Sequence, residues 1–297
     1  MRILEVKTVQ SGAFRILIEA LKEILTDVNI DFTKKVETVN DKGEVDVEGG
    51  MGIIAMNSSN SVLIHLKLDA FNFDEYSCVK DKLTIGVNMT FFFKLIKTMN
   101  NTDTLTLYMD DDDTNRLGIR IENSDKNLVS TWKLNLMDLE DYDIRIPPTE
   151  FTSVINMPAQ EFHKICRDLN PIADNIEIKS VGKKLIFTTK GEIAHNEIII
   201  GESGSGLNVT LDEEESDTII QGIYDLKNLT LFTKCTNLCS NIDIYMKNDY
   251  PLVIRYAVAS LGQIHLCLSS NSDDINNEEE YISDDYDLDE DLEDLEI

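Results

Sequence analysis

Residues 136–151 read LMDLEDYDIRIPPTEF and stand at the middle of a chain of 297 residues. The pair Pro147-Pro148 fixes two φ angles and supplies no amide donors, so this segment cannot form a helix or a central strand and is expected to run extended. Its apolar side chains Leu139, Ile144 and Ile146 alternate with acids, which leaves apolar positions on a solvated strap. Because the sequence on either side shows the same order of elements, we interpret the segment as a connector between two related halves.

Each half is predicted to follow the order strand, amphipathic helix, strands, and the chain is long enough for two separate cores. In the first half, apolar side chains at 14, 17, 18 and 21 recur at helical spacing, and Asn88 is a suitable N-cap for a second helix through residue 99. In the second half, Pro158 suits the first turn of a third helix, and residues 225–235 form a fourth. Residues 34–50 are interpreted as an extended hairpin or a loop. The predicted strands are 3–9, 28–32, 36–39, 52–57, 61–69, 83–87, 105–109, 116–122, 129–136, 151–157, 176–180, 184–189, 192–200, 207–211, 242–246, 252–259 and 263–268.

The charge of the chain is strongly negative, with 55 acids against 27 Lys and Arg and a formal net charge of −28. A chain this acidic is repelled by nucleic acid unless its cations gather on one surface. Residues 271–297 contain 14 acids and no Lys or Arg, so they supply half of the net charge. We expect this segment to be a disordered acidic tail, or at most a nascent helix with Leu288, Leu292 and Leu295 on one side.

The cysteines and the N-terminus indicate a soluble protein that is not secreted. Five cysteines without a CxxC spacing argue against a fully paired disulfide framework and for a reducing, intracellular compartment. A secretory signal core would have to contain Arg2, Glu5 and Lys7, and no apolar run reaches the roughly 18 residues that a membrane span needs.

Candidate chemistry is sparse. The acids at 110–113 suit either a cation site or a solvated turn, and the four histidines lack metal-ligand spacing. Cys235 and Cys239 are one helical turn apart and are either a redox pair or small packed side chains. The glycine-rich residues 201–206 lack the GK[ST] ending of a phosphate loop, and no catalytic triad is recognisable. We therefore expect no catalytic residue, no metal and no cofactor, and the chain is not expected to be an enzyme.

The cations follow a more informative pattern, because each predicted helix carries two of them on its polar face. One such pair is usually a solvated face, but four pairs at equivalent places in a repeated unit favour a common cationic surface. Lys and Arg that face phosphates are sufficient for binding duplex DNA without sequence specificity. The predicted DNA-binding residues are Arg15, Lys22, Lys94, Lys97, Lys164, Arg167, Lys227 and Lys234.

Several short motifs occur in an order and at a spacing that identify a family. They are Glu19-Ala-Leu-Lys22, Gly86-Val-Asn-Met-Thr90, Leu136-Met-Asp-Leu-Glu140, Met157-Pro158 with Glu161-Phe162, Ile165-Cys-Arg-Asp-Leu169, Phe232-Thr-Lys234, Pro251-Leu-Val-Ile254 and Ala259-Ser-Leu-Gly262. Over roughly residues 1–270 the chain resembles proliferating cell nuclear antigen, the eukaryotic DNA sliding clamp.

This resemblance implies an α+β DNA clamp fold with two similar domains, each with β-sheets outside and two inner α-helices. The implied domains are residues 1–134 and 151–270, joined by an interdomain connector at 135–150 and followed by the acidic tail at 271–297. Three identical chains would close head to tail into a ring that encircles double-stranded DNA. The eight cations of each chain would line the hole, 24 in a homotrimer. Such a clamp tethers DNA polymerase and other replication and repair proteins to their template and has no catalysis of its own.

The resemblance also implies how the ring closes. In the family, the strand that leads into the connector pairs with an edge strand of the next chain, and here these are residues 129–136 and 192–201. The implied subunit-interface residues are Trp132, Ile193, His195 and Glu197. For Trp132 the alternative is an ordinary core tryptophan.

Clients of the family, including DNA polymerase and the clamp loader, insert a short peptide with apolar and aromatic side chains between the connector and the C-terminal domain. The matching partner-peptide pocket residues are Met56, Leu63, Ile144, Ile146, Pro147, Tyr250, Pro251 and Ser269. Asn60 stands where the family often has histidine, and Ser269-Ser270 replaces an Ala-Pro pair that clients contact through the backbone. Gly182 replaces a lysine that the family modifies, and residues 34–50 and the acidic tail are additional.

Two other functions share parts of this pattern. One is a subunit of a heterotrimeric checkpoint clamp, and the other is a monomeric or dimeric processivity factor that grips DNA directly. The resemblance implies a nuclear location, or the viral replication site if the source is a large DNA virus.

Overall fold

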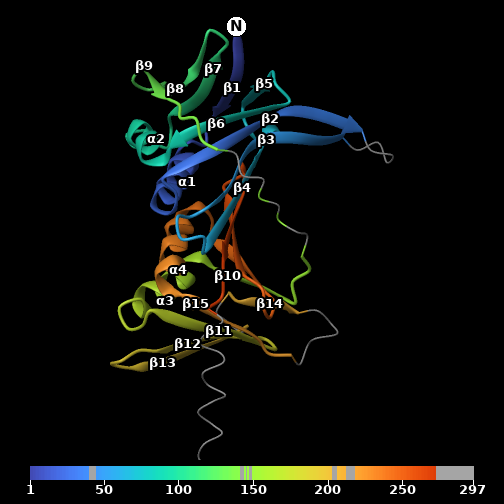
Figure 1. Cartoon of the computed structure of the whole chain (residues 1–297), viewed down its shortest axis with the longest axis vertical. Helices are drawn as coiled ribbons and strands as arrows, with labels where there is room; N and C mark the ends of the chain where they lie inside the picture. Colours follow the sequence, from blue (N-terminus) through green and yellow to red (C-terminus); the bar gives the residue numbers. More distant parts are fainter. Residues whose placement is uncertain are drawn as a thin grey trace, which may run out of the picture.

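The computed structural model describes residues 1–39, 45–140, 144, 146, 149–202, 206–211 and 218–271. The described residues form two similar halves stacked along the long axis of the molecule, and all four α-helices lie along the same side (Figure 1). The first half contains β1 (Arg2–Thr8), α1 (Ser11–Ile24), β2 (Asp27–Val39), β3 (Val45–Met56), β4 (Val62–Asp69), η1 (Ala70–Asn72), β5 (Glu75–Cys78), β6 (Lys82–Asn88), α2 (Met89–Ile96), β7 (Thr104–Asp110), β8 (Asp113–Asn123) and β9 (Leu128–Asn135). The second half contains β10 (Ser153–Pro158), α3 (Ala159–Leu169), β11 (Asn175–Val181), β12 (Lys184–Lys190), β13 (His195–Gly201), β14 (Asn208–Leu211), β15 (Ile220–Asp225), α4 (Leu226–Phe232), η3 (Thr233–Leu238), β16 (Asn241–Met246), β17 (Leu252–Val258) and β18 (Gly262–Leu268).

Three antiparallel sheets carry these helices. A nine-stranded sheet in the order β14-β10-β16-β17-β18-β4-β3-β2-β6 runs through both halves, and the pairing of β18 with β4 joins them. A five-stranded sheet, β5-β1-β7-β8-β9, belongs to the first half, and a four-stranded sheet, β13-β12-β11-β15, belongs to the second. The two halves therefore share one continuous sheet, which fixes their helices on a common side.

The apolar stripes read from the sequence are the buried faces of the helices. Helix α1 buries Phe14, Leu17, Ile18 and Leu21, and the ring of Phe14 meets Phe92 of α2 edge to face with the centroids 6.2 Å apart. Apolar residues at this spacing lie on one side of a helix, so burying them turns the polar side to solvent. The same pattern holds in α3 and α4, so the cations on the opposite faces are directed outward from the same side of the molecule.

The ends of two helices differ from the sequence prediction. Helix α2 begins as expected, because the Asn88 side chain accepts a hydrogen bond from Phe91 N at 3.0 Å, but it ends at Ile96 rather than at residue 99. Helix α4 ends at Phe232 and continues as the 3₁₀ helix η3, in which threonine hydroxyls donate to main-chain carbonyls three residues earlier. Such local side-chain bonds compete with regular α-helical hydrogen bonding.

Three other sequence expectations also change. Pro158 is the last residue of β10 and the N-cap of α3, with φ −60° and ψ 127°, rather than a first-turn residue. Strands β5 and β15 were not predicted. Strand β5 has only four residues, and β15 comes soon after the acidic sequence at 212–217, which obscures its pattern. The segments 28–32 and 36–39 belong to a single strand, β2, interrupted by a bulge between Thr33 and Val36.

The hairpin prediction for residues 34–50 is correct, because β2 and β3 pair as far as Val39 and Val45 and project from the body (Figure 1). Tyr76 contacts its base: the hydroxyl oxygen lies 2.8 Å from the Thr33 carbonyl oxygen and 2.7 Å from that of Gly50, and these two acceptors share its single proton. The acidic residues 272–297, for which we predicted disorder or a nascent helix, lie outside the described residues.

Candidate nucleic-acid interface

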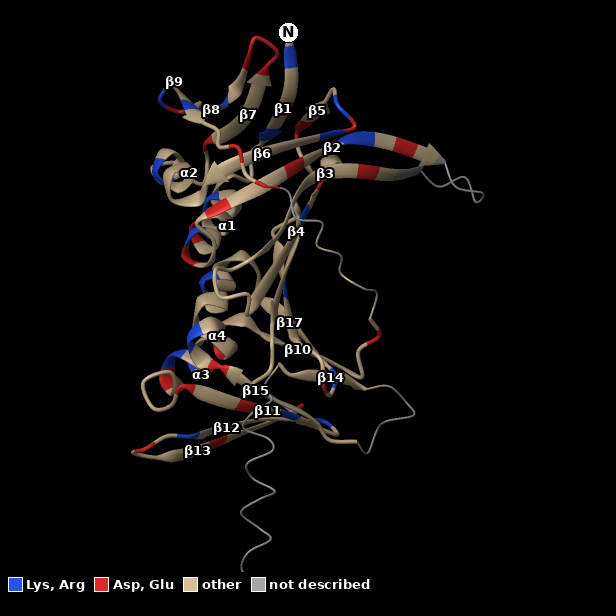
Figure 2. Cartoon of the chain, viewed as in Figure 1, with Lys and Arg blue, Asp and Glu red and all other residues tan. Residues whose placement is uncertain are grey.

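All eight predicted cations lie on the helical side of the molecule. Figure 2 shows Lys and Arg recurring along this side, on the helices of both halves. Six of the eight side chains are exposed, whereas Arg15 and Lys22 are half-buried in the surface of α1. Lys97 directly follows α2, and Lys234 lies in η3 rather than in α4. We call these eight residues the cationic face.

Among the described residues, most of the cationic face lacks an acidic partner. Of its eight cations only Lys22 and Arg167 form ion pairs there, each with the acid next to it in the chain, Glu23 and Asp168. Within the described part of the chain, the other six cations have no carboxylate within 4.0 Å: they are Arg15, Lys94, Lys97, Lys164, Lys227 and Lys234. Arg15 also has a buried Nε atom without a hydrogen-bond acceptor.

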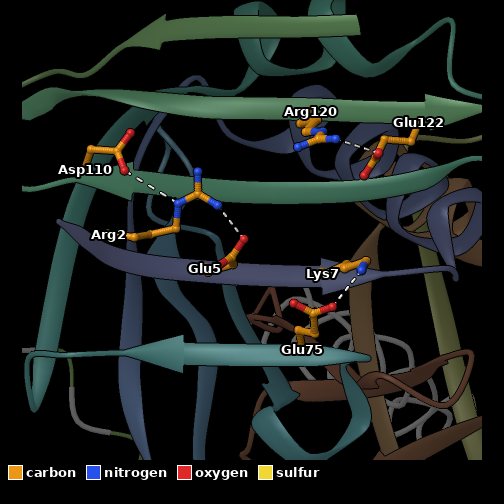
Figure 3. A network of polar contacts seen from close by, with 7 residues as sticks. All are labelled: Arg2, Glu5, Lys7, Glu75, Asp110, Arg120 and Glu122. Carbon is orange, nitrogen blue, oxygen red and sulfur yellow. Dashed lines mark hydrogen bonds and ion pairs between the residues drawn. The ribbon is translucent and has the colours of Figure 1, made fainter. Parts of the chain in front are cut away.

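The cations of the outer sheets behave differently. In the five-stranded sheet, Arg2 bridges Glu5 and Asp110, and Lys7 Nζ lies 2.6 Å from Glu75 Oε1 (Figure 3). Similar pairs involve Arg120, Lys67, Lys82, Arg116, Lys133, Lys179, Lys183 and Arg255. Outer cations are thus largely neutralised by neighbouring acids, whereas the cationic face remains open to an external polyanion.

Two phenylalanines of α2 hold lysines of the cationic face in place. Lys94 Nζ lies 5.1 Å from the centroid of Phe91, which is 56% exposed, and Lys22 Nζ lies 4.9 Å from the centroid of Phe93. Cation–π contacts at this distance are attractive. Sequence reasoning missed both rings, although the run of three phenylalanines at 91–93 was a signal, because consecutive helical residues cannot all face the core.

A crevice of about 680 Å³ lies between the start of the connector and the strands β2 and β3. Of the eight predicted pocket residues, Met56 and Ile144 line it. The connector is held over it by the Asn29 side chain, whose Nδ2 donates to the Glu140 carbonyl at 3.1 Å. The complete lining is Asp27, Val28, Asn29, Ile54, Ala55, Met56, Asn60, Asp138, Leu139, Glu140 and Ile144. Exposed Ile54 was missed because strand alternation alone does not tell which face is covered.

The other predicted pocket residues lie beyond this lining. Leu63 pairs with Met56 across β3 and β4, and the Ser269 amide donates to the Ser61 carbonyl beside that pair. Tyr250 Oη accepts a hydrogen bond from Thr149 Oγ1 at 3.2 Å, at the opposite end of the connector. Pro251 and Ile146 are exposed, and Pro147 lies outside the described residues.

A glycine anchors the start of the connector. The Met137 amide donates to the Gly86 carbonyl at 2.8 Å, which makes the one bridge between the connector and β6 in the described chain. A Cβ atom at Gly86 would come within 2.4 Å of the Met137 carbonyl oxygen. This close approach explains why position 86, the first of the GVNMT motif, requires a residue without a side chain.

Two sheet edges expose apolar side chains. Strand β9 is the edge of the five-stranded sheet and β13 is the edge of the four-stranded sheet. Trp132 on β9 is 46% exposed, so its alternative assignment to the core is wrong. Ile193, two residues before the start of β13, is 92% exposed, and His195 and Glu197 on β13 are also exposed. Long apolar edges of this kind are templates for pairing with another chain.

The remaining candidates show no catalytic arrangement among the described residues. These residues contain no cluster of three potential metal ligands and no helix that could cross a membrane. Burial raises the pKa of the Cys235 thiol to about 12, which favours packing over redox chemistry. The rings of His65 and His265 stack across β4 and β18 with their centroids 5.8 Å apart, and burial lowers the pKa of His265 to about 4.

The amino-acid sequence matches known proteins over most of its length. Residues 3–143 match the model of the proliferating cell nuclear antigen N-terminal domain, and residues 145–271 match that of the C-terminal domain. The probable DNA polymerase sliding clamp 1 of Paramecium bursaria Chlorella virus 1 is 30% identical over 271 residues, which cover 90% of this chain and 96% of that protein. The chain belongs to the proliferating cell nuclear antigen family.

A second viral relative agrees with this membership. The probable DNA polymerase sliding clamp of Acanthamoeba polyphaga mimivirus is 32% identical over 293 residues, covering 90% of this chain and 62% of that longer protein. The two domain models of the proliferating cell nuclear antigen family meet at residue 144, inside the connector. The bridge between Gly86 and Met137 therefore ties the start of the connector to the N-terminal half.

Proposed function

We propose that this chain is a DNA sliding clamp, a processivity factor that encircles duplex DNA and tethers polymerases and other replication proteins. The observation that carries the proposal is the cationic face. Six cations that have no acid partner in the described part of the chain are gathered on the helices of one side, and the formal charge of the whole chain is −28. The names of the two viral relatives point to the same function.

The cationic face is suited to binding duplex DNA without sequence specificity. Its groups are Lys and Arg on helix surfaces, which contact phosphates and carry no sequence information. Acidic outer surfaces would repel DNA, so the duplex is directed to this one side. In this assignment Arg15, Lys22, Lys94, Lys97, Lys164, Arg167, Lys227 and Lys234 are the DNA-binding residues. We place the domains at 1–134 and 151–270 and the connector at 135–150.

We further propose that three copies close into a ring through the exposed edges. Strand β9 of one chain pairs with β13 of the next, with Trp132, Ile193, His195 and Glu197 in the contact. Two different edges on one chain make a head-to-tail interface, which generates a ring when its rotation closes. Pairing would satisfy the free backbone groups of both edges and cover their apolar side chains.

The crevice beside the connector is the proposed docking site for client peptides with apolar and aromatic side chains, such as those of a DNA polymerase or a clamp loader. Met56 and Ile144 form part of its lining, and the other assigned residues extend the surface toward Tyr250. Tethering by such peptides raises the effective concentration of a polymerase on its template without any catalysis by the clamp. The site of action would be wherever DNA is replicated, in the nucleus or at a viral replication site.

Removal of the Ile144 side chain tests the docking site. Ile144→Ala is expected to weaken binding of a polymerase-derived peptide about tenfold, because an apolar side chain contributes roughly 1.5–3 kcal/mol when it is fully buried. Fluorescence anisotropy with a labelled peptide measures the change. An unchanged affinity would remove the connector from the docking site.

Stoichiometry and topology test the clamp assignment together. Size-exclusion chromatography with light scattering is expected to give three times the chain mass of 33.7 kDa. Chains loaded on nicked circular DNA should stay bound at high salt and leave when the circle is cut, since only an encircling ring is released through an end. A single-chain mass with tight, salt-sensitive binding to short linear duplex would instead indicate a factor that grips DNA directly.

A further inference from the structure

The described chain ends on β15, the strand that leads into α4. The Asn271 amide donates to the Ile223 carbonyl at 2.8 Å, and the Asn271 side chain contacts Asn175 Oδ1 at 2.9 Å. Strand β15, which contains Ile223, leads directly into α4, where Lys227 is exposed. Ile223 and Lys227 are four residues apart, so their Cα atoms lie within about 14 Å of each other. The acidic segment, defined here as residues 272–297, therefore starts from the strand that leads into α4.

The charge of the acidic segment complements this face. It contains 14 acids and no Lys or Arg in 26 residues. Most outer cations already pair with acids, as Lys7 does with Glu75, whereas six cations of the cationic face have no such partner among the described residues. Elsewhere on the described surface, cations without an ion pair such as Lys126 and Lys184 are scattered over separate strands and turns. Among the described residues, these six cations are thus the largest set of unpaired cations on one side of the molecule.

The length of the acidic segment is sufficient. Twenty-six residues span up to about 90 Å when extended, while α3, with 11 residues, is only about 17 Å long. A tethered partner of this length has an effective concentration in the millimolar range. Opposite charges held within the Debye length of about 8 Å attract one another even at physiological salt.

We propose that the acidic segment 272–297 occupies the cationic face when no DNA is present and is displaced by duplex DNA. The inference rests on the proposed function, which identifies the face as the DNA-binding surface. The segment acts as an intramolecular polyanion that competes with phosphates for the same Lys and Arg side chains. It therefore weakens binding to DNA that is not enclosed, while a closed ring remains on its duplex by topology.

Zero-length carbodiimide cross-linking locates the acidic segment, because this chemistry joins a carboxylate to an amine in direct contact. In the full-length chain we expect mass spectrometry to identify links from residues 273–296 to Lys94, Lys164 and Lys227. Addition of a 20-base-pair duplex should remove these links. Exposed Lys126 and Lys184 serve as internal controls and should link rarely. Equal linking to all five lysines, or links that persist in saturating duplex, would overturn the proposal.

Binding measurements test the competition itself. One variant ends after Asn271, a second keeps the full length but replaces every Asp and Glu of 272–297 by Asn and Gln, and a third scrambles the order of that segment. We expect the first two to bind a short linear duplex on the order of tenfold more tightly at low salt, with a difference that shrinks as salt rises. The scrambled variant should match the parent chain, because the attraction depends on charge rather than sequence.

The alternative is that the acidic segment is a solubilising spacer. In that case all four chains bind the duplex equally and differ only in solubility, which would overturn the inference. Retention on nicked circular DNA, measured on the same preparations, separates the two hypotheses. If the parent chain stays on the circular DNA but the acidic segment does not cross-link to the cationic face, only the proposed competition is rejected. If the parent chain does not stay on the circular DNA, the clamp assignment is rejected.

Discussion

The paired substitution Lys94→Ala with Lys164→Ala tests the role of the cationic face most directly. Both side chains are exposed, one on α2 and one on α3, and neither has an acid partner in the described chain. Among the described residues their removal breaks no ion pair and one exposed cation–π contact, that of Lys94 with Phe91. The free energy of unfolding should therefore change by no more than about 1 kcal/mol.

The expected effect on DNA binding follows from counterion release. Each cation that neutralises a phosphate contributes about 0.9 to the slope of log affinity against log salt. For every chain that contacts the duplex, the double variant should reduce this slope by about 1.8. A fourfold rise in salt would then cost the variant about tenfold less affinity than it costs the parent chain.

The assay is a titration of fluorescent duplex at four salt concentrations, with light scattering to confirm the assembly. Lys126→Ala with Lys184→Ala is the matched control, because it removes the same charge from exposed positions off the cationic face. The control should leave the slope unchanged. If both pairs of substitutions changed the slope equally, or if the first pair alone split the assembly, the assignment of this face to DNA would be wrong.

Three further substitutions test other parts of the structure. Gly86→Ala places a Cβ atom 2.4 Å from the Met137 carbonyl oxygen of the connector and should lower the free energy of unfolding by about 1–3 kcal/mol. Gly201→Ala is the control, because its Cβ atom would meet no atom within 4 Å, and it should leave the free energy of unfolding unchanged. Thermal unfolding compares the two variants. Trp132→Ala should weaken subunit association by about 2 kcal/mol or more, seen by light scattering on dilution, and an unchanged assembly would place the tryptophan outside the interface. Since burial lowers the pKa of His265 to about 4 and also lowers that of His65, the unfolded chain binds more protons between pH 4 and 6.5. Stability should thus be greatest above pH 6.5 and decline toward pH 4, and His265→Gln should flatten this decline in denaturant titrations at each pH.

Local pattern was sufficient for much of the fold. Four helices were predictable because apolar side chains at helical spacing mark the face that packs, and the Asn88 cap was visible as a side chain suited to orphan amides. Helix ends were less predictable. The threonine hydroxyl bonds that convert 233–238 into a 3₁₀ helix depend on geometry that the sequence does not display.

By itself, the sequence determined the repeated order of elements, the cations on each helix and the motifs of the proliferating cell nuclear antigen family. Only the tertiary structure decided which cations keep an acid partner, because ion pairs such as Lys7 with Glu75 join strands 68 positions apart. It also decided that Trp132 lies on an exposed edge and that Met56 and Ile144 line one crevice. The physical reason is that periodicity records which face of a single element is apolar. Which faces then meet, and which charges are left open, depends on how distant elements pack.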